Sequence, residues 1–311
     1  MHVLSRDQSL FAAEDVSGAW SRGELTLAIF RSASGQSPDN AAERELAAVL
    51  LGAAVHLLYL VSDVLDDVED GDYTDAGLAM PLALNASTGL LFLAQHALLS
   101  IPGTIVAASR LAEAVCRFNL ELVRVCSGQH EDLQSSSFED SMSEERCLAV
   151  AEAKNSAMHG TFYALAATLA SDNQELVKLF RAFGSKLGLA LQLQNDLHDI
   201  LSPQSKQDLP GGKATLPLVY SLAQAEYAPQ LQRLLQELTE RPQAKEVLDQ
   251  AMELIWHAGG IHYTWVQSQL AGIEACDIVK QIERHCKPDA YVYRVIQLYQ
   301  VQDEELSGLL A

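Results

Sequence analysis

The sequence predicts an all-α fold, and three observations support that prediction. Four long stretches repeat their apolar residues with the 3.6-residue period of a helix, at 43–70, 104–133, 143–170 and 174–201. Few stretches show the strict alternation that is typical of strands. Aromatic residues make up 6% of the chain and there are 9 prolines, a composition that suits helices better than sheets. With 311 residues, 49% of them hydrophobic, the chain can bury a large core.

The remaining elements follow from the same patterns. Residues 1–40 are predicted to be irregular, because Ser, Gly, Asp and Asn gather towards residue 40. The fourth long helix is followed by a loop rich in Pro and Gly, Ser202–Gly212. Shorter helical patterns complete the chain at 214–225, 228–239, 242–257, 261–284 and 289–308. No repeat, low-complexity tract or linker is evident, so residues 1–311 are expected to form one domain of roughly ten helices.

Charge and cysteine usage exclude several classes of protein. Lys and Arg number 21 against 41 Asp and Glu, and a net charge of −20 gives no general attraction to nucleic acid or to anionic membranes. The five cysteines contain no CxxC pair, which favours a reducing compartment without disulfides or a zinc site. The N-terminus lacks the apolar core of a signal peptide. The longest apolar stretch, 47–61, is too short to span a bilayer, so we expect a cytoplasmic protein without transmembrane segments.

An acidic cluster ends the first long helix. At about 100° per residue, Asp63, Asp67 and Asp70 share a face, and Asp66 forms a second i,i+4 pair with Asp70. Close carboxylates repel one another unless a cation lies between them, which favours a divalent metal site. A solvated acidic helix end with Gly71 as its cap explains the cluster equally well. The spacing of an EF-hand loop is absent.

A second polar cluster lies late in another long apolar helix and contains Gln192, Asn195, Asp196 and Asp199. Asn195 and Asp199 are again spaced i,i+4, and two such clusters on two helices favour a cleft that binds divalent metal. The loop that follows carries Lys213 directly after a glycine, so that backbone and ammonium can approach a phosphate closely. The loop does not match the P-loop pattern.

Five ordered elements carry a resemblance to the trans-isoprenyl diphosphate synthases, the polyprenyl synthetase family. They are Asp66-Asp67-Val-Glu-Asp70, Gly128-Gln129-His-Glu-Asp132, Lys154, the segment Gln192–Asp199, and Asp208-Leu-Pro-Gly-Gly-Lys213-Ala-Thr-Leu-Pro217, which matches the family letter for letter. Their order and spacing match over about residues 43–285. The resemblance implies a single-domain isoprenoid-synthase helical bundle with a central apolar cleft, assembled as a homodimer.

The resemblance also implies a chemistry. Two or three Mg²⁺ ions would bridge an allylic diphosphate, such as geranyl or farnesyl diphosphate, to Asp63, Asp66, Asp67, Asp70, Asn195, Asp196 and Asp199. Lys154 and Lys213 would stabilise the departing diphosphate, with Gln129, Asp132 and Gln192 supporting the substrate. The acceptor would then attack the allylic cation inside a dry cavity.

The chain departs from the family pattern where isopentenyl diphosphate should bind. No Lys or Arg occurs between Arg44 and Arg110, so the family's RRG is missing, and Ser21-Arg22-Gly23 is the nearest remnant of its N-terminal GGKRxRP. Two registers of the first motif are open. A family histidine at His56 selects Asp63 and Asp67, whereas the literal DDxxD selects Asp66 and Asp70. In the first register, Tyr59 either limits chain length or is simply core.

Three functions are compatible with these losses. The expected one is a prenyltransferase with a non-standard acceptor, similar to the competence-pheromone prenyltransferases of bacilli that modify a peptide. The others are a class I terpene cyclase and a silent regulatory subunit of a heteromeric synthase. An ordinary elongating synthase would need Arg22, Arg31, Arg44 or Arg110 to rebuild the missing site.

Overall fold

The computed structural model describes residues 21–35, 39–71, 73, 77–134, 142–201, 208–242 and 244–299, and over these residues it contains helices and turns but no strand. The prediction of an all-α fold is therefore confirmed. In chain order the elements are α3 (Arg22–Ser34), α4 (Ala41–Glu69), α5 (Met80–Leu99), α6 (Ala108–Gln134), α7 (Glu144–Ala151), a π-helical turn η1 (Glu152–Ser156), α8 (Ala157–Ala170), α9 (Gln174–Leu201), α10 (Asp208–Gly211), α11 (Leu216–Leu222), α12 (Ala228–Glu240), α13 (Lys245–His257), α14 (Gly260–Ile282) and α15 (Ala290–Gln297).

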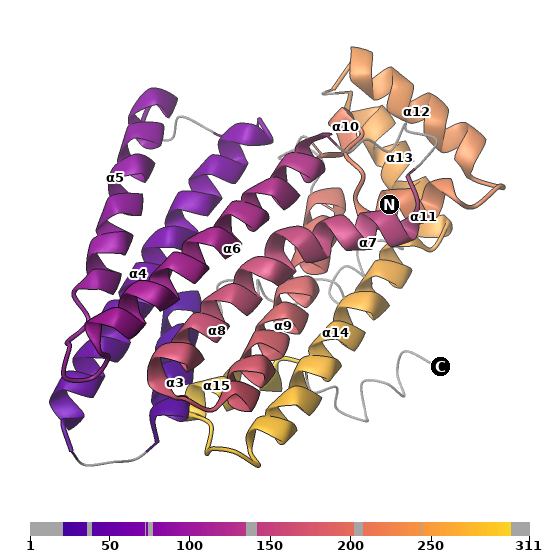
Figure 1. The fold of residues 1–311 in the computed structure, drawn as a ribbon. Helices are drawn as coiled ribbons and strands as arrows, with labels where there is room; N and C mark the ends of the chain where they lie inside the picture. The colour runs from indigo at the N-terminus through magenta and orange to yellow at the C-terminus, as the bar shows by residue number, and fades with distance from the viewer. Residues whose placement is uncertain are drawn as a thin grey trace.

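Long helices lie side by side in the bundle, with α8 and α9 at its centre (Figure 1). Helix α8 is buried on all sides because nearly all of its residues are apolar or small. It packs closely against α9 because α9 presents glycines to it. A Cβ on Gly188 would lie 2.6 Å from the Asn155 carbonyl oxygen, and one on Gly184 would lie 2.6 Å from that of His159. This close packing fixes the turn η1 beside the second half of α9.

Three of the helices were not predicted from the sequence. The short helix α10 lies within the predicted loop Ser202–Gly212, of which residues 202–207 are outside the described part of the chain. Helix α3 lies within the segment expected to be irregular. Ser21 caps it, and Leu25, Ile29 and Phe30 are buried, so the Ser- and Gly-rich run marks where this helix ends. Helix α5 shows no amphipathic stripe, since its buried residues are only Ala83, Ser87, Ala94 and Leu98 in an otherwise apolar sequence. A 3.6-residue period is hard to detect in a helix that is apolar on most sides.

Helices α4 and α5 are long and apolar enough to cross a bilayer by length and composition alone. This corrects the expectation that no apolar stretch in the chain reaches that length. The apolar window of α4 is 44% buried, and α4 packs against α3 and α5 as a core helix of the bundle. The window of α5 is 22% buried, which leaves a broad apolar face outside the core.

Candidate active site

The literal first motif, at the C-terminal end of α4, faces two lysines. The Nζ of Lys154 lies 2.8 Å from Oδ1 of Asp66, and the Nζ of Lys213 lies 2.8 Å from Oδ2 of Asp70. Gln129 of α6 also donates from Nε2 to Oδ1 of Asp66, over 2.9 Å. Segments far apart in the sequence thus meet at one end of α4.

Asp132 of α6 joins the two lysines. Its Oδ2 lies 3.0 Å from the Nζ of Lys154 and 3.4 Å from that of Lys213, and its side chain is 14% exposed. Lys154 sits in η1, where one wider helical turn changes the direction of the side chains. Lys213 follows Gly212, whose φ of 65° turns the chain at the end of α10. We call Asp66, Asp70, Asp132, Lys154 and Lys213 the lysine–aspartate cluster.

Opposite charges keep the buried groups of this cluster ionised. Burial alone would lower the pKa of Lys154, but Asp132 and Asp66 outweigh it and the pKa is raised. Burial alone would raise the pKa of Asp66, but Lys154, with Lys213 and Gln129, outweighs it and the pKa is lowered. The two shifts agree, because each partner favours the charged form of the other. Near neutral pH the site therefore holds ammonium and carboxylate groups side by side.

The second motif, in α9, has a different arrangement. Asp196 is 6% exposed, and burial raises its pKa to about 6 although Gln192 donates to its Oδ1 over 2.8 Å. Its Oδ2 accepts from the backbone N–H of Leu216 at 3.4 Å, so this carboxyl ties α9 to the start of α11. Gln192 in turn accepts from Asn155. Asn195 is exposed, and the Asp199 side chain is 18% exposed beside His198.

In the other register of the first motif, the first aspartate is Asp63, which lies near Arg22. Oδ2 of Asp63 is 3.7 Å from Nη1 of Arg22, and the guanidinium of Arg22 lies 4.6 Å from the centre of the Tyr59 ring. Asp67 is exposed on α4. Tyr59 is 2% exposed and packs against Phe162 with ring centres 4.9 Å apart, so it belongs to the core between α4 and α8.

The oxygen donors of both motifs suit Mg²⁺ by their chemistry. Within the part of the chain that the structure describes, no three His, Cys, Asp or Glu side chains are arranged as a ready-made metal site. Two of the expected ligands, Asp66 and Asp70, are paired with lysines instead. The residues therefore fit the ion chemically, and one oxygen of Asp66 and one of Asp70 are engaged by the lysines.

Sequence reasoning missed two polar residues of this region. Glu69 accepts a hydrogen bond from Gln129 at 2.9 Å, and Asn155 donates to Gln192. Glu69 lies three residues after Asp66 and thus on the same side of α4, a signal that the spacing offered. Two buried atoms here, Oε1 of Gln129 and Oγ1 of Thr215, have no hydrogen-bond partner. Bound water or a polar ligand would satisfy such groups.

Fold and site together define a helical bundle in which two lysines meet the acidic end of α4 and Asp132 of α6. The family model described as polyprenyl synthetase matches residues 13–255, and the chain belongs to this family. The geranylgeranyl diphosphate synthase of Mycobacterium tuberculosis H37Rv is 29% identical over 262 residues, 79% of this chain and 70% of the relative. A (2E,6E)-farnesyl diphosphate synthase of Mycobacterium bovis is 28% identical over 254 residues, 76% of this chain and 68% of the relative.

Solved structures show the same fold. The geranylgeranyl pyrophosphate synthetase of Pyrococcus horikoshii aligns with a TM-score of 0.69 at 20% identity and covers 90% of this chain and 84% of its own. A polyprenyl synthase of Caulobacter crescentus, complexed with calcium and isoprenyl diphosphate, also aligns with a TM-score of 0.69 at 20% identity. The alignment covers 93% of this chain and 84% of that protein's chain. The relatives named above are prenyltransferases, so the expected enzyme class is confirmed, while the roles of individual residues stay predictions.

Proposed function

We propose that this protein ionises an allylic isoprenyl diphosphate, such as geranyl or farnesyl diphosphate, with two or three Mg²⁺ ions and transfers the prenyl group. The observation that supports this most strongly is the lysine–aspartate cluster. Lys154 and Lys213 are 12% and 18% exposed and share Asp132 between them. Preorganised cations of this kind stabilise negative charge that develops on a departing diphosphate.

The ion pairs of the cluster suggest how diphosphate and metal bind together. Diphosphate oxygens compete with Asp66 and Asp70 for the two ammonium groups, since all are anionic acceptors. When the lysines turn to the diphosphate, the carboxylates of Asp66 and Asp70 become available to Mg²⁺. Asp63, Asp67, Asn195, Asp196 and Asp199 complete the proposed ligand set. The bound ions would neutralise the charge of the leaving group.

The acceptor is proposed to be something other than isopentenyl diphosphate. Of the four arginines that could rebuild that site, Arg22 lies beside the first acidic cluster. Arg31 pairs with Glu45, and Arg110 donates to the carbonyl oxygens of Thr168 and Ser171. Arg44 lies 22 residues before Asp66 in the same helix, which is about 33 Å along the axis.

One measurement separates the candidate functions. The protein is incubated with Mg²⁺ and geranyl or farnesyl diphosphate, with and without isopentenyl diphosphate, and released diphosphate and extracted products are measured. Release without isopentenyl diphosphate supports the proposal, with prenyl alcohols as products when the acceptor, for instance a peptide, is absent. Cyclic hydrocarbons would show a terpene cyclase, and longer diphosphates formed only with isopentenyl diphosphate would show an elongating synthase. No release under any condition would favour a silent subunit.

Variants test the assignment of the residues. Asp67→Ala, Asp199→Ala and Lys213→Ala should each abolish diphosphate release and leave the helical circular dichroism spectrum nearly unchanged. Lys186→Ala is the matched control, because Lys186 pairs with Glu274 on the surface. Full turnover in both aspartate variants would contradict the metal-binding role.

A homodimer is also proposed. Helices α5 and α6 expose large apolar side chains, among them Leu82, Leu91, Phe92, Leu93, Leu99, Leu120 and Val123. An uncovered apolar face of this extent favours an interface, and a second copy of the chain is the partner that the family resemblance implies. Phe92 is 68% exposed, and Phe92→Glu should convert a dimer into a monomer in analytical ultracentrifugation. A monomeric wild-type protein would contradict the proposal.

The single domain over residues 1–311, the cytoplasmic location and the lack of a nucleic-acid partner stay predictions from composition and pattern.

A further inference from the structure

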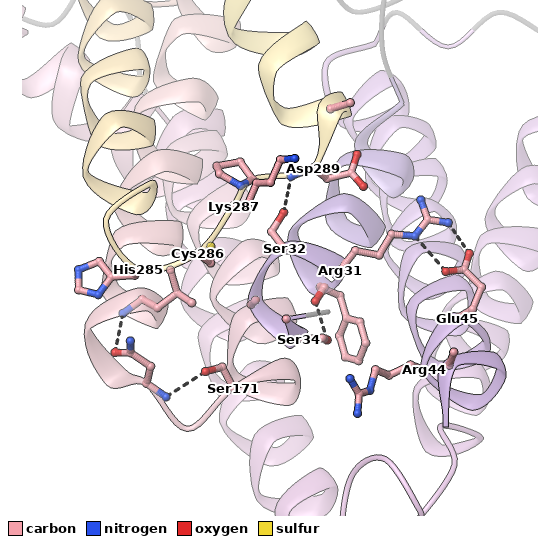
Figure 2. Close-up of a pocket in the computed structure, with 18 residues that line it drawn as sticks. Arg31, Ser32, Ser34, Arg44, Glu45, Ser171, His285, Cys286, Lys287 and Asp289 are labelled. Carbon is pink, nitrogen blue, oxygen red and sulfur yellow. Dashed lines mark hydrogen bonds and ion pairs between the residues drawn. The ribbon is translucent and has the colours of Figure 1, made fainter. Parts of the chain in front are cut away.

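Two regions away from the lysine–aspartate cluster hold polar groups that the proposed reaction does not use. One is a hollow of about 710 Å³ at the end of α3 and the start of α4 (Figure 2). Polar groups there pair with one another, since Arg31 donates to Glu45 and the Oγ of Ser32 accepts from the backbone N–H of Asp289 over 2.8 Å. The other is the interior beside η1, where His159 is only 1% exposed.

His159 bonds to the backbone of η1 through one ring nitrogen. Its Nδ1 lies 2.9 Å from the carbonyl oxygen of Asn155, and a carbonyl only accepts, so Nδ1 carries the proton. Its Nε2 is buried without a hydrogen-bond partner. Burial lowers the pKa of His159 to about 3, which keeps the ring neutral in this tautomer. The rings of Tyr59 and Tyr163, centred 5.2 and 6.1 Å away, hold its orientation.

Helix α9 packs directly on this hydrogen bond. A Cβ on Gly188 would lie 2.6 Å from the Asn155 carbonyl oxygen and 3.0 Å from Nδ1 of His159. One turn further along α9, the side chain of Gln192 accepts a hydrogen bond from that of Asn155. Because the bond is sealed between η1, α8 and α9, water does not compete for it, and its loss would leave a buried acceptor unpaired.

Helix α6 packs on a second side of η1. A Cβ on Gly128 would lie 2.7 Å from the backbone carbonyl of Ala153. Lys154 thus lies between Ala153, which α6 contacts, and Asn155, which α9 contacts. The turn itself is π-helical, a conformation that is rare and wider than an α-helical turn. The direction of the Lys154 side chain therefore depends on whether this turn keeps its conformation.

We propose that His159 is a positioning residue for Lys154. The hydrogen bond from its Nδ1 to the Asn155 carbonyl holds η1 in the π-helical conformation. That conformation directs the Lys154 ammonium to its contacts of 2.8 Å with Asp66 and 3.0 Å with Asp132. Without the donor, the turn relaxes and the ammonium leaves these contacts. The effect on catalysis rests on the function proposed above, whereas the placement of Lys154 does not.

The first test measures the placement of Lys154 without turnover. The fall in Tm that Lys154→Met causes is determined in the wild-type, His159→Leu and His159→Asn backgrounds. Leucine fills the space without a donor, whereas the asparagine amide places a donor near the position of Nδ1. We expect the fall to shrink to less than about half in His159→Leu and to keep more than about three quarters of its wild-type size in His159→Asn.

The order of stabilities separates positioning from packing. His159→Asn leaves a cavity and should have the lower Tm of the two variants, so a purely structural role would disturb Lys154 more in His159→Asn. Phe162→Leu is the matched control, because Phe162 is 1% exposed in the same core and its apolar ring cannot bond to η1. It should lower the Tm and leave the effect of Lys154→Met unchanged. His159→Met, with a flexible side chain and no N–H donor, replaces His159→Leu if that variant fails to fold.

The second test measures diphosphate release from geranyl diphosphate with Mg²⁺. His159→Leu should lower kcat by about tenfold and change KM less, because the charge that Lys154 meets grows as the C–O bond breaks. His159→Asn should keep kcat within about threefold of the wild type. No release by the wild-type protein would contradict the proposed function, and the Tm measurements would still decide the placement of Lys154.

Two results would overturn the positioning role. One is an equal effect of Lys154→Met on Tm in the His159→Leu and wild-type backgrounds. The other is an effect of Lys154→Met that shrinks as much in His159→Asn as in His159→Leu, since the ring itself and not its N–H donor would then be what matters.

Discussion

Replacing Lys154 with Met removes the central cation of the lysine–aspartate cluster and keeps most of its apolar length. At 2.8 and 3.0 Å, each ion pair of Lys154 has a gross attraction of roughly 5 to 6 kcal/mol at an effective dielectric constant of about 20. The net loss is much smaller. Asp66 is 43% exposed, so its pair counts for about 1 kcal/mol. The Asp132 side chain is only 14% exposed but keeps Lys213, so its pair counts for about 2 kcal/mol.

The expected loss of unfolding free energy is therefore about 3 kcal/mol, which corresponds to a fall in Tm of roughly 5 °C for a chain of this size. The loss should appear in the pH range where both partners are charged. Because the pKa of Lys154 is raised, the ion pairs stabilise the protein up to about pH 10. Because the pKa of Asp66 is lowered, its pair also persists down to about pH 4, and below that pH the stabilisation fades as Asp66 is protonated.

Thermal unfolding followed by circular dichroism at 222 nm measures this difference. Lys186→Met is the control, because its partner Glu274 and Lys186 itself are 55% and 38% exposed and should contribute under about 1 kcal/mol. The double variant with Asp132→Asn should show a coupling of about 1 to 2 kcal/mol. A Tm within 1 °C or so of the wild type, or strictly additive losses, would refute the reasoning that Lys154 and Asp132 form one charged unit.

Three further predictions follow from packing and linkage. Gly128→Ala should lower the free energy of unfolding by about 2 kcal/mol, because a Cβ would lie 2.7 Å from backbone atoms of Ala153. Gly89→Ala is the control: its Cβ would have nothing within 4 Å, so it should stabilise α5 by up to about 1 kcal/mol in the same unfolding assay. Burial lowers the pKa of His159 to about 3, so the unfolded chain binds this proton more readily than the folded one. The free energy of unfolding should therefore fall by about 3 kcal/mol as the pH drops from about 6.5 to about 4. His159→Leu should flatten this pH dependence when Tm is measured as a function of pH. Saturating Mg²⁺ with diphosphate should raise the Tm of the wild type by about 5 °C, and equal shifts from either alone would contradict their coupled binding.

The order of the motifs and the period of the long helices were readable from the sequence. Helix α9 begins and ends where its apolar period predicts, at 174 and 201. The acidic ends of α4 and α9, with Lys213, were identified because carboxylates and a lysine in this pattern suit metal and phosphate chemistry, whereas Lys154 was identified by the resemblance alone. The resemblance that these residues carried is confirmed by the family match.

Which cation each aspartate of the site pairs with was decided by the tertiary structure. Helical periodicity places four aspartates on one side of α4, but it does not say which cation each one meets. Asp66 and Asp70 pair with lysines 88 and 143 residues away, while Asp63 lies towards Arg22. Such pairs depend on how α4, α6, η1 and the loop before α11 pack together, and packing is set by contacts between residues distant in the sequence.

The same reason explains why sequence reasoning did not predict helices α3 and α5. Helix α3 is held by burial of Leu25, Ile29 and Phe30, and α5 has too little polar contrast for its period to show. Local pattern therefore determined the helices with a clear apolar stripe and the chemistry they carry. Only the packing of the bundle decided which charges meet, because electrostatic partners are chosen by proximity in space.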